Sequence, residues 1–402
     1  MKVKIQKSRA EGIAKAPPSK SMAHRALICG ALSGESSIKN IASSKDIEAT
    51  LSCLTSLGAK CKKTENGLSI GGLNPFEPNE NATLFCNESG STLRFFIPLC
   101  MLSGKKITLT GSERLFERPL GIYEEIAAQN GILFEKKENS VTVCGRLKSG
   151  EYKIPGDISS QFISGLMFAL PLLEGNSSIE VTGKFESASY IDLTLSALLK
   201  FGIEIKREKN TFYITGNQRY RNCEYTVEGD CSNAAFLDGF NMLGGDVKVE
   251  GISENTLQGD RVYKDIYAAL KKGKKSFDLS DCPDLAPVLF AISAANGGAE
   301  FTGTARLKIK ESDRAEAMRK ELSKFGIEVL VNENSVLISG GELKAPKEEL
   351  CGHNDHRIVM ALSLLLSKTG GVIDGIEAVS KSYPDFFEVI KALKIGMEIY
   401  EN

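Results

Sequence analysis

Residues 322–329 (LSKFGIEV) and residues 335–340 (SVLISG) contain the pattern that decides the fold. An amphipathic helix ends at a glycine, a short apolar strand follows, and a polar turn leads to a second strand that also ends at a glycine. Glycine suits the helix end because it adopts a positive φ at little cost. The β-branched and apolar residues that follow favour strands. The pattern therefore predicts a helix followed by a β-hairpin.

The same pattern recurs around Gly58, Gly131 and Gly202 with a period of about 70 residues. A degenerate copy is expected near Gly273, and a truncated copy is expected at Gly396. This period exceeds that of ordinary solenoid repeats. Six copies therefore predict an α/β protein in which each of two globular domains contains three units.

The composition excludes several classes of protein. Of the 402 residues, 42% are hydrophobic, and 50 Lys and Arg face 51 Asp and Glu, for a net charge of −1. Such a chain can bury a core, and its balanced charge excludes a polybasic nucleic-acid coat or a membrane-surface protein. A strong anion site must therefore come from a local concentration of Lys and Arg.

Nothing in the sequence points to secretion or to a membrane. The N-terminus lacks an apolar signal segment, and the apolar runs at residues 162–173 and 358–366 are too short to span a bilayer. The ten cysteines include no Cys-x-x-Cys pair, which favours reduced core thiols over disulfides or zinc ligands. We expect a cytoplasmic protein.

Basic residues recur beside the starts of predicted helices. Capping accounts for the neighbouring Ser, Asp and Asn, but cations at a helix N-terminus are mildly unfavourable. A bound anion would explain them, although each motif alone is also consistent with a capped helix that carries solvated charges. The cations are Lys20, Arg25, Lys310, Arg314, Arg357 and Lys381.

Other polar motifs precede apolar helices. A hydroxyl-rich loop, Ser89-Gly90-Ser91-Thr92, could present backbone N–H groups to a phosphate or carboxylate. Ser159, Ser160 and Gln161 could cap a helix or bind a hydroxylated ligand. His353 and His356 have a spacing compatible with metal binding, but no cluster of further ligands accompanies them, so we expect no metal. The sequence contains neither of the common glycine-rich nucleotide-binding motifs.

Taken together and in order, these motifs resemble the 5-enolpyruvylshikimate-3-phosphate synthase family. The resemblance runs from Lys20 to Lys381 and rests on PSKS with Arg25, SGST with Arg94, ERP, SSQ, KESDR, NDHR and KSYPD. It implies a two-domain inside-out α/β barrel with three βαβαββ repeats in each domain. The N-terminal domain, 17–225, would mainly bind shikimate 3-phosphate. Residues 1–16 with 226–402 would supply the catalytic carboxylates and the phosphoenolpyruvate-binding cations, with the active site in the interdomain cleft.

The family reaction transfers the enolpyruvyl group of phosphoenolpyruvate to the 5-hydroxyl of shikimate 3-phosphate through a tetrahedral intermediate and releases phosphate. The resemblance implies no cofactor and no metal. It also implies small-molecule substrates as the only partners, with neither nucleic acid nor membrane. We expect a monomer.

The resemblance also assigns residues. For catalysis they are Asp284, Glu311 and Lys20. For shikimate 3-phosphate they are Lys20, Ser21, Arg25, Ser159, Ser160, Gln161, Ser187, Tyr190, Asp284, Arg306 and Lys310. For phosphoenolpyruvate they are Lys20, Gly90, Arg118, Gln161, Arg314, Arg357 and Lys381. Glu88, Ser91 and Arg306 depart from the pattern of many members, which bears on glyphosate sensitivity more than on the reaction.

Physical chemistry supports these assignments. Two anionic substrates repel each other unless cations are placed in advance, and arginine binds carboxylate and phosphate in bidentate geometry. The hydroxyl nucleophile needs a base, and a carboxylate among cations has a lowered pKa that suits a base. Asp284 is the expected proton acceptor, and Glu311 is expected to exchange protons with the methylene carbon.

Two alternatives, one enzyme and one binding protein, fit the sequence less well than this interpretation. UDP-N-acetylglucosamine enolpyruvyl transferase has the same fold and donor, but it usually carries a loop cysteine, and no cysteine lies between Cys100 and Cys144. A non-catalytic scaffold for anions or nucleic acid would explain the cations. It would not explain Asp284 and Glu311 among them, and no series of stacking aromatics is present.

Overall fold

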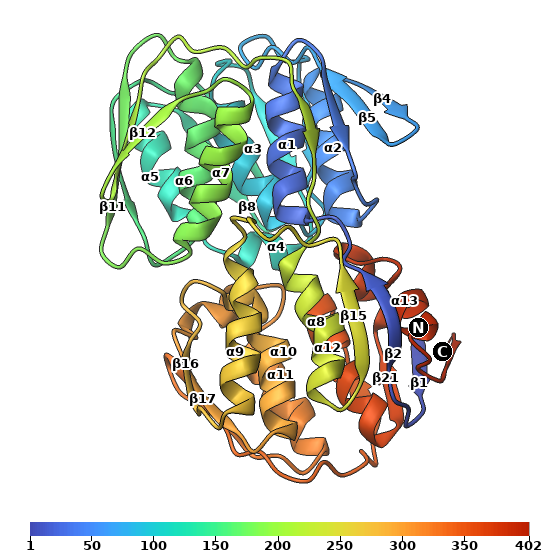
Figure 1. The fold of residues 1–402 in the computed structure, drawn as a ribbon. Coiled ribbons are helices and arrows are strands. Elements are labelled where there is room, and N and C mark those ends of the chain that lie inside the picture. The colour runs from blue at the N-terminus through green and yellow to red at the C-terminus, as the bar shows by residue number, and fades with distance from the viewer. Residues whose placement is uncertain (402) are drawn as a thin grey trace. The chain divides into compact units, whose positions relative to one another are not determined.

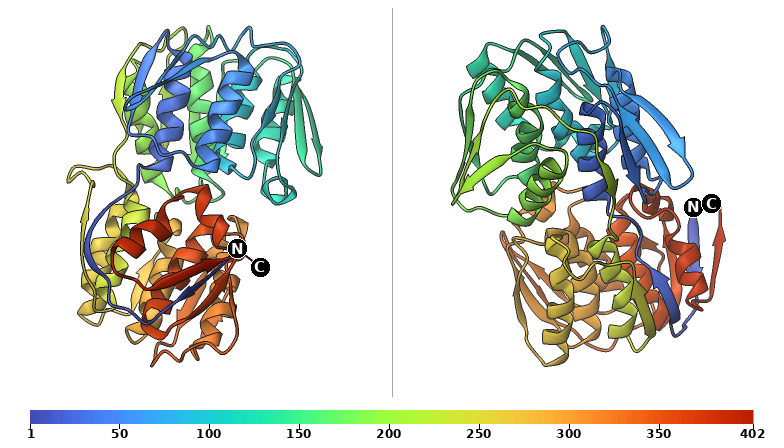
Figure 2. Two further views of the ribbon diagram at one scale, coloured as in Figure 1. Left: turned by 90° about the vertical axis from the view of Figure 1, so that its right-hand side faces the viewer. Right: turned by 45° about the horizontal axis from the view of Figure 1, so that its top comes forward.

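A computed structural model describes residues 1–401 and divides the chain into two compact units. The N-terminal unit is Pro18–Glu228, and the C-terminal unit combines Met1–Pro17 with the chain from Gly229 onward. Each unit has its own apolar core. Strand β1 (Lys2–Ile5) pairs with β22 (Met397–Tyr400) in the C-terminal unit, so the two ends of the chain lie side by side (Figure 2).

Two complete βαβαββ repeats lie in the N-terminal unit. In each, two parallel strands are joined by a helix, and a second helix leads to an antiparallel hairpin. The first repeat consists of β6 (Thr83–Phe85), α3 (Gly90–Cys100), β7 (Ile107–Thr110), α4 (Glu113–Glu117), α5 (Gly121–Asn130), β8 (Leu133–Lys137) and β9 (Ser140–Cys144). The second consists of β10 (Glu151–Pro155), α6 (Ser160–Ala169), β11 (Ser177–Thr182), α7 (Ala188–Lys200), β12 (Ile205–Glu208) and β13 (Thr211–Ile214).

The third repeat of this unit combines elements from the start and from the end of Pro18–Glu228. Its continuous part is α1 (Lys20–Leu32), β3 (Ser36–Lys39), α2 (Lys45–Leu57), β4 (Lys60–Thr64) and β5 (Gly67–Gly71). Its parallel edge strand is β14 (Glu224–Thr226), which pairs with β3. A boundary at residue 225 would cut this strand, so the unit continues to Glu228.

The C-terminal unit contains two further repeats with the same strand order. One consists of β16 (Ser276–Asp278), α10 (Ala286–Ala295), β17 (Ala299–Thr302), α11 (Arg314–Lys324), β18 (Val329–Val331) and β19 (Ser335–Ile338). The other consists of β20 (Leu350–Cys351), α12 (His356–Thr369), β21 (Gly371–Asp374), α13 (Phe386–Ala392) and β22, and β1 completes its sheet.

The degenerate sixth copy predicted near Gly273 is confirmed. It consists of β2 (Glu11–Lys15), α8 (Cys231–Met242), β15 (Asp246–Glu250) and α9 (Tyr263–Lys271). Strands β2 and β15 form a two-stranded parallel sheet. Gly273 has φ +85° after α9, but the next strand, β16, belongs to the neighbouring sheet, so this copy lacks the hairpin.

The predicted glycines end their helices as expected in four copies. Gly58, Gly131, Gly202 and Gly326 have φ between 68° and 116°. The prediction was wrong in the last copy, because the residue with positive φ after α13 is Lys394 (φ 67°), two positions before Gly396. The amides of Lys394 and Ile395 donate to carbonyls of α13 and thereby close the helix without a glycine.

Helices fill the interior of each unit, and the sheets form its outer wall (Figure 1). Helices α3 and α6 are buried on nearly all sides and pack on each other, as do α10 and α12 in the C-terminal unit. Strand β4, by contrast, is exposed along its whole length. This arrangement buries the side chains at the starts of several helices.

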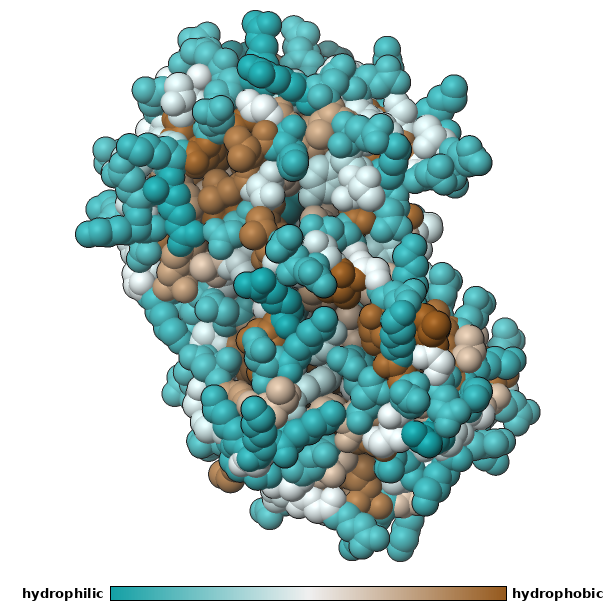
Figure 3. Space-filling view, viewed as in Figure 1, coloured by the Kyte–Doolittle hydropathy of each residue, from teal (hydrophilic) through white to brown (hydrophobic). Residues whose placement is uncertain are grey.

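The face of the molecule in Figure 3 is mainly polar, and the thiols are free. The face shown in Figure 3 is mainly hydrophilic with separate apolar patches. Within residues 1–401, no helix combines the length and apolar character needed to cross a membrane. All ten cysteines are free; six are buried, whereas Cys61 and Cys351 are exposed rather than in the core.

Variants of Lys394 test the left-handed backbone conformation that ends α13 in the last repeat. A left-handed conformation costs a non-glycine residue about 1–2 kcal/mol, so Lys394→Gly should be more stable than Lys394→Ala by about 1 kcal/mol. Both variants lose the exposed ion pair between Lys394 and Glu11, so the comparison isolates the backbone. The midpoints of urea unfolding measure the difference, and an alanine variant as stable as the glycine variant would contradict the assignment.

Candidate active site

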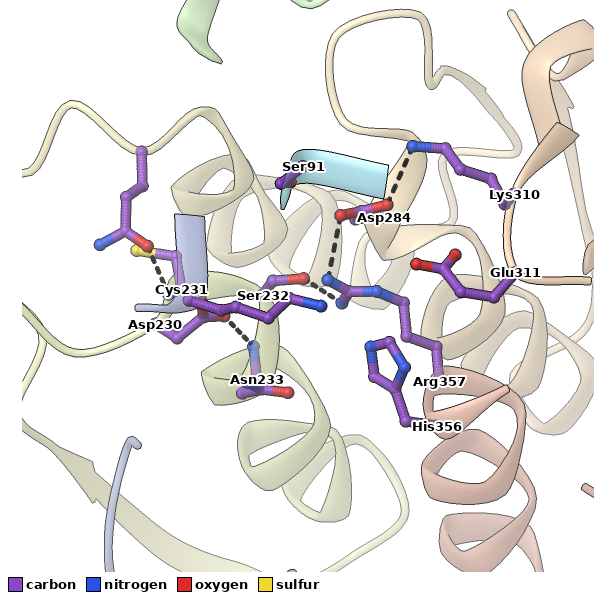
Figure 4. A network of polar contacts seen from close by, with 12 residues as sticks. Ser91, Asp230, Cys231, Ser232, Asn233, Asp284, Lys310, Glu311, His356 and Arg357 are labelled. Atoms are coloured by element: carbon purple, nitrogen blue, oxygen red, sulfur yellow. Dashed lines mark hydrogen bonds and ion pairs between the residues drawn. The ribbon is translucent and has the colours of Figure 1, made fainter. Parts of the chain in front are cut away.

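A partly buried carboxylate, Asp284, lies at the centre of a charged cluster in the C-terminal unit. It belongs to a 3₁₀ helix, Pro283–Leu285, directly before α10. Its Oδ1 accepts hydrogen bonds from Lys310 Nζ at 3.2 Å and from Arg314 Nη1 at 2.8 Å. Its Oδ2 accepts one from Arg357 Nη2 at 3.0 Å (Figure 4). Three of the predicted cations therefore meet on the predicted base.

The surrounding charges keep Asp284 ionised. Burial alone would raise its pKa, but Arg357, Lys310 and Arg314 outweigh burial and hold the pKa of Asp284 well below its ordinary value. Burial lowers the pKa of Lys310, and Asp284 opposes that effect. The carboxylate is thus deprotonated at neutral pH, which is the state that a proton acceptor needs.

Arg314, the first residue of α11, is engaged by three carboxylates. Its side chain is 1% exposed and also donates from Nη2 to Glu311 Oε2 at 2.8 Å and from Nε to Asp355 Oδ2 at 2.9 Å. Burial alone would lower the pKa of Arg314, but Asp355, Glu311 and Asp284 raise it. Arg314 therefore holds the two predicted catalytic carboxylates in place.

Asp355 was not predicted as a site residue, yet it connects two elements of the cluster. It is the N-cap of α12, where Oδ1 accepts from the Arg357 amide at 3.0 Å, and Oδ2 accepts from Ser312 and Arg314. Burial alone would raise the pKa of Asp355, but Arg314 lowers it. One fully buried carboxylate thus joins α11 to α12.

The other predicted cations of this unit make backbone or hydroxyl contacts. Arg357 also donates from Nη1 to Ser232 on α8, a residue that the sequence did not single out (Figure 4). Lys381 donates to the carbonyl of Asn354, and Arg306 donates to the carbonyl of Ser280. All three cations are buried, at 5–8% exposed.

The N-terminal unit contains a second cluster at the start of α1. Lys20, the first residue of α1, donates to Asp46 Oδ2 at 2.6 Å. Arg25 is buried and donates to Thr194 Oγ1 at 2.8 Å and to the carbonyls of Ser21 and Tyr190. Burial lowers the pKa of Arg25 to about 10, so its guanidinium stays charged at neutral pH.

Ser19 precedes α1 as its N-cap residue, but its side chain makes no capping hydrogen bond, which contradicts the capping role considered for it. The neighbouring Ser21 lies within α1. The start of this helix therefore keeps its first amides free of a side-chain cap. Free N–H groups at a helix N-terminus favour a bound anion.

Arg118 lies over the start of α3. A Cβ atom built on Gly90, the first residue of α3, would lie 2.5 Å from Arg118 Nη1. The Arg118 side chain is buried, at 8% exposed, and among residues 1–401 it has no hydrogen-bond or ion-pair partner. A buried guanidinium beside a helix N-terminus is a strong anion site, because both the charge and the free amides attract an anion.

Gln161 connects two helix starts in the same unit. Its Oε1 accepts from Arg94 at 2.7 Å, and its Nε2 donates to Ser91 Oγ at 2.9 Å. Ser159 caps α6 by accepting from the Gln161 amide, and Ser160 is the first residue of the helix. Arg94 was part of the motif but not among the predicted site residues.

Ser187 is buried and has φ 57°, a conformation that is uncommon for serine. It immediately precedes α7, and Tyr190 lies in the first turn of that helix. The Tyr190 carbonyl accepts from both Arg25 and Thr194. The structure thus places Tyr190 beside Arg25 within the N-terminal unit.

The lowered pKa values generate a prediction for acid stability. Asp284 and Asp355 bind protons more readily in the unfolded chain, so their contribution to stability is present above about pH 4, the ordinary aspartate pKa, and is lost as pH falls through the folded pKa. Asp355→Asn should cost about 3 kcal/mol at pH 7 and should weaken the loss of stability on acidification. Urea unfolding at pH 7 and at several values below pH 4 measures both effects.

The matched control is Glu316→Gln, which breaks an exposed ion pair with Arg319 at the start of the same helix, α11. It should leave both the stability at pH 7 and its dependence on pH close to those of the unmodified chain. An Asp355→Asn variant whose stability falls as steeply with acidification as that of the unmodified chain would contradict the role of Asp355.

Comparison with known proteins identifies relatives along the whole chain. The family model for EPSP synthase (3-phosphoshikimate 1-carboxyvinyltransferase) matches residues 5–390. A 3-phosphoshikimate 1-carboxyvinyltransferase of Clostridium kluyveri is 43% identical, over 99% of this chain and 98% of the relative. One of Clostridioides difficile is 40% identical, over 97% of each chain.

Solved structures confirm the fold class predicted from the repeats. The EPSP synthase of Acinetobacter baumannii superposes over 100% of both chains with a TM-score of 0.80 at 24% identity. The enolpyruvyl transferase NikO of Streptomyces tendae covers 99% of this chain and 98% of its own, with a TM-score of 0.78 at 13% identity. At these identities the likeness concerns the fold, whereas the family model and the curated relatives confirm the resemblance seen in the motifs. The chain belongs to the EPSP synthase family.

Proposed function

We propose that this chain transfers the enolpyruvyl (1-carboxyvinyl) group of phosphoenolpyruvate to the 5-hydroxyl of shikimate 3-phosphate and releases phosphate. Membership in the family supports this reaction, and the names of the curated relatives support it. The observation that carries the proposal is Asp284, a carboxylate kept ionised among Lys310, Arg314 and Arg357. A negative charge would weaken a site that only binds anions, whereas a reaction at a hydroxyl group needs a base there.

The reaction requires two proton transfers, and each is assigned to one carboxylate. Asp284 takes the proton of the 5-hydroxyl as that oxygen attacks C2 of phosphoenolpyruvate, and C3 gains a proton to become a methyl group. Glu311, held by Arg314 2.8 Å away, exchanges this proton with C3. Loss of a C3 proton from the tetrahedral intermediate, together with cleavage of the C–O bond to phosphate, restores the double bond.

Two arginines are suited to hold phosphoenolpyruvate. The Nε groups of Arg118 and Arg357 are buried and lack an acceptor among residues 1–401. A buried N–H without a partner is costly, and phosphate or carboxylate oxygens would satisfy it with charge-assisted hydrogen bonds. We assign Gly90, Gln161, Arg314 and Lys381 to the same substrate, as the resemblance implies.

The remaining assigned residues would recognise shikimate 3-phosphate. Lys20 and Arg25 supply charge for its phosphate, and hydroxyl groups at helix starts supply neutral hydrogen bonds to the ring. The assignment covers Ser21, Ser159, Ser160, Ser187, Tyr190, Arg306 and Lys310. The ammonium of Lys20 is a compact cation on a flexible side chain. It could therefore stay close to the negative charge of the substrates as that charge shifts during the reaction.

We also propose that the clusters of both units act on one pair of substrates, as the expected interdomain active site requires. The N-terminal unit supplies cations and hydroxyl donors, and the C-terminal unit supplies the base, so neither set alone meets the needs of the reaction. A single chain carries both sets, so the proposed reaction requires no residue from a second copy. Ten free cysteines support a reducing compartment such as the cytoplasm.

The first test is a phosphate-release assay with the purified chain. Phosphoenolpyruvate alone should release no phosphate, and addition of shikimate 3-phosphate should start the reaction. UDP-N-acetylglucosamine should not replace shikimate 3-phosphate. Release with the sugar nucleotide would favour the alternative transferase, and the absence of release with either acceptor would favour a binding scaffold.

A pair of variants tests the base in the same assay. Asp284→Asn keeps the shape of the side chain but cannot accept the proton, so kcat should fall by about 10²- to 10⁴-fold while shikimate 3-phosphate still binds. The control, Asp281→Asn, changes an exposed carboxylate in the same loop and should leave kcat unchanged. Equal kcat in both variants would remove Asp284 from the mechanism.

Gly90→Ala tests the anion site at α3. The added Cβ would lie 2.5 Å from Arg118 Nη1 and would displace the guanidinium. Loss of a charge-assisted contact should raise KM for phosphoenolpyruvate about tenfold or more. Gly121→Ala is the matched control, because Gly121 also begins a helix, α5, but has open space at its Cβ. Steady-state kinetics with varied phosphoenolpyruvate measure KM, and equal values for both variants would contradict this site.

A further inference from the structure

Four buried side chains form a continuous hydrogen-bond chain inside the N-terminal unit. His24 Nδ1 lies 2.8 Å from Thr50 Oγ1, which lies 2.7 Å from Thr92 Oγ1, which lies 2.7 Å from Ser89 Oγ. All four residues are at most 1% exposed. The chain runs from α1 through α2 to the N-cap of α3.

The direction of each hydrogen bond follows from counting protons. A hydroxyl group has one proton, and Thr92 donates its proton to Ser89 Oγ. Thr92 therefore accepts from Thr50, which uses the only proton of Thr50. Thr50 in turn accepts from His24, so Nδ1 of His24 must carry a proton.

His24 is neutral in this arrangement. Burial, followed by the charges of Lys20 and Arg25, holds the pKa of His24 well below its ordinary value. Its Nε2 is buried and has no hydrogen-bond partner among residues 1–401. A neutral ring with its proton on Nδ1 leaves an acceptor rather than a charged donor at that buried atom, and an unpaired buried charge is far costlier.

The ion pair of Lys20 with Asp46 joins α1 to α2, and the hydrogen bond of His24 to Thr50 joins the same two helices. Lys20 and His24 are four residues apart on α1, and their partners Asp46 and Thr50 are four residues apart on α2. Residues at this spacing share a helix face. The first link holds a predicted catalytic cation, and the second leads to Ser89 at the start of α3.

Ser89, the last member of the hydrogen-bond chain, fixes the first turn of α3. Ser89 Oγ accepts from the Thr92 amide at 3.2 Å as well as from the Thr92 hydroxyl, so the N-cap is held by two hydrogen bonds. Gly90, under the Arg118 guanidinium, is the next residue. Movement of this turn would move the amides and the close contact that form the anion site.

We propose that His24, Thr50 and Thr92 are positioning residues that lock the start of α3 through Ser89 and thereby set the phosphoenolpyruvate site at Gly90 and Arg118. This role rests on the proposed function. The hydrogen-bond chain itself does not, so its direction can be tested without any substrate.

The first test determines the tautomer of His24 in the full chain at pH 7.5. Long-range ¹⁵N–¹H NMR spectra distinguish the two neutral forms of histidine, and the chain has only three histidines. The spectrum of a His24→Asn variant identifies the signal of His24 by its loss. The proposal expects a neutral ring protonated at Nδ1. A ring protonated at Nε2, or at both nitrogens, would overturn it even if the chain had a different activity.

The second test measures kinetics. Thr92→Val removes the hydroxyl but keeps the shape, so kcat/KM for phosphoenolpyruvate should fall by about 10- to 100-fold, while KM for shikimate 3-phosphate stays unchanged. Thr92→Ser keeps the hydroxyl and should restore most of the activity. His24→Asn should also retain activity, because an asparagine amide nitrogen can take the place of Nδ1, whereas His24→Leu should resemble Thr92→Val.

Thr55→Val is the control for threonine replacement on α2, because the Thr55 hydroxyl is exposed and bonds only within its own helix. It should match the unmodified chain. Equal losses in Thr92→Val and Thr92→Ser would assign the effect to packing, and a parallel rise in KM for both substrates would indicate a general structural role. Either result, or full activity of Thr92→Val, would overturn the proposal.

Discussion

The burial of positive charge at the starts of helices is the constraint on which the rest of this structure depends. A buried cation is costly unless an anion or several hydrogen-bond acceptors compensate it. In the C-terminal unit the compensation is internal, since Asp284, Asp355 and Glu311 surround Arg314. Arg118 in the N-terminal unit has no such partner within residues 1–401. The same principle therefore supports the proposed base in one unit and the proposed anion site in the other.

The repeat explains why these charges are buried. The helices of each repeat lie inside and the sheets lie outside (Figure 1), and the first residues of α3, α6, α11 and α12 are buried. Lys20, Gly90, Ser160, Arg314 and Arg357 all lie within the first two residues of α1, α3, α6, α11 or α12. The proposed site residues thus occupy equivalent places in different copies of one structural unit. N-caps such as Ser89 and Asp355 hold the starts of α3 and α12 in position.

Sequence reasoning predicted the parts of this structure that leave a local signal. Glycines at helix ends and paired strands revealed the repeat. Cations beside helix starts pointed to Lys20, Arg314 and Arg357, which the structure places against carboxylates, and their role in binding substrate stays a prediction. Sequence reasoning missed residues whose type fits two roles, such as an aspartate that can either stabilise a helix start or pair with a distant cation. Asp355 and Asp46 look like ordinary acidic residues at helix starts, and only tertiary contacts show their partners. Lys394 took the place expected for Gly396, because hydrogen bonds to α13 hold a lysine in a conformation that usually calls for glycine.

The central claim is that cations set in place by the fold hold phosphoenolpyruvate for a reaction that Asp284 starts. A crystal structure of the chain with shikimate 3-phosphate and phosphoenolpyruvate, determined with the Asp284→Asn variant to prevent turnover, tests it most directly. The account predicts that anionic oxygens of phosphoenolpyruvate lie within hydrogen-bond distance of both Arg118 and Arg357. Phosphoenolpyruvate bound in the crystal without contact to either arginine would contradict it.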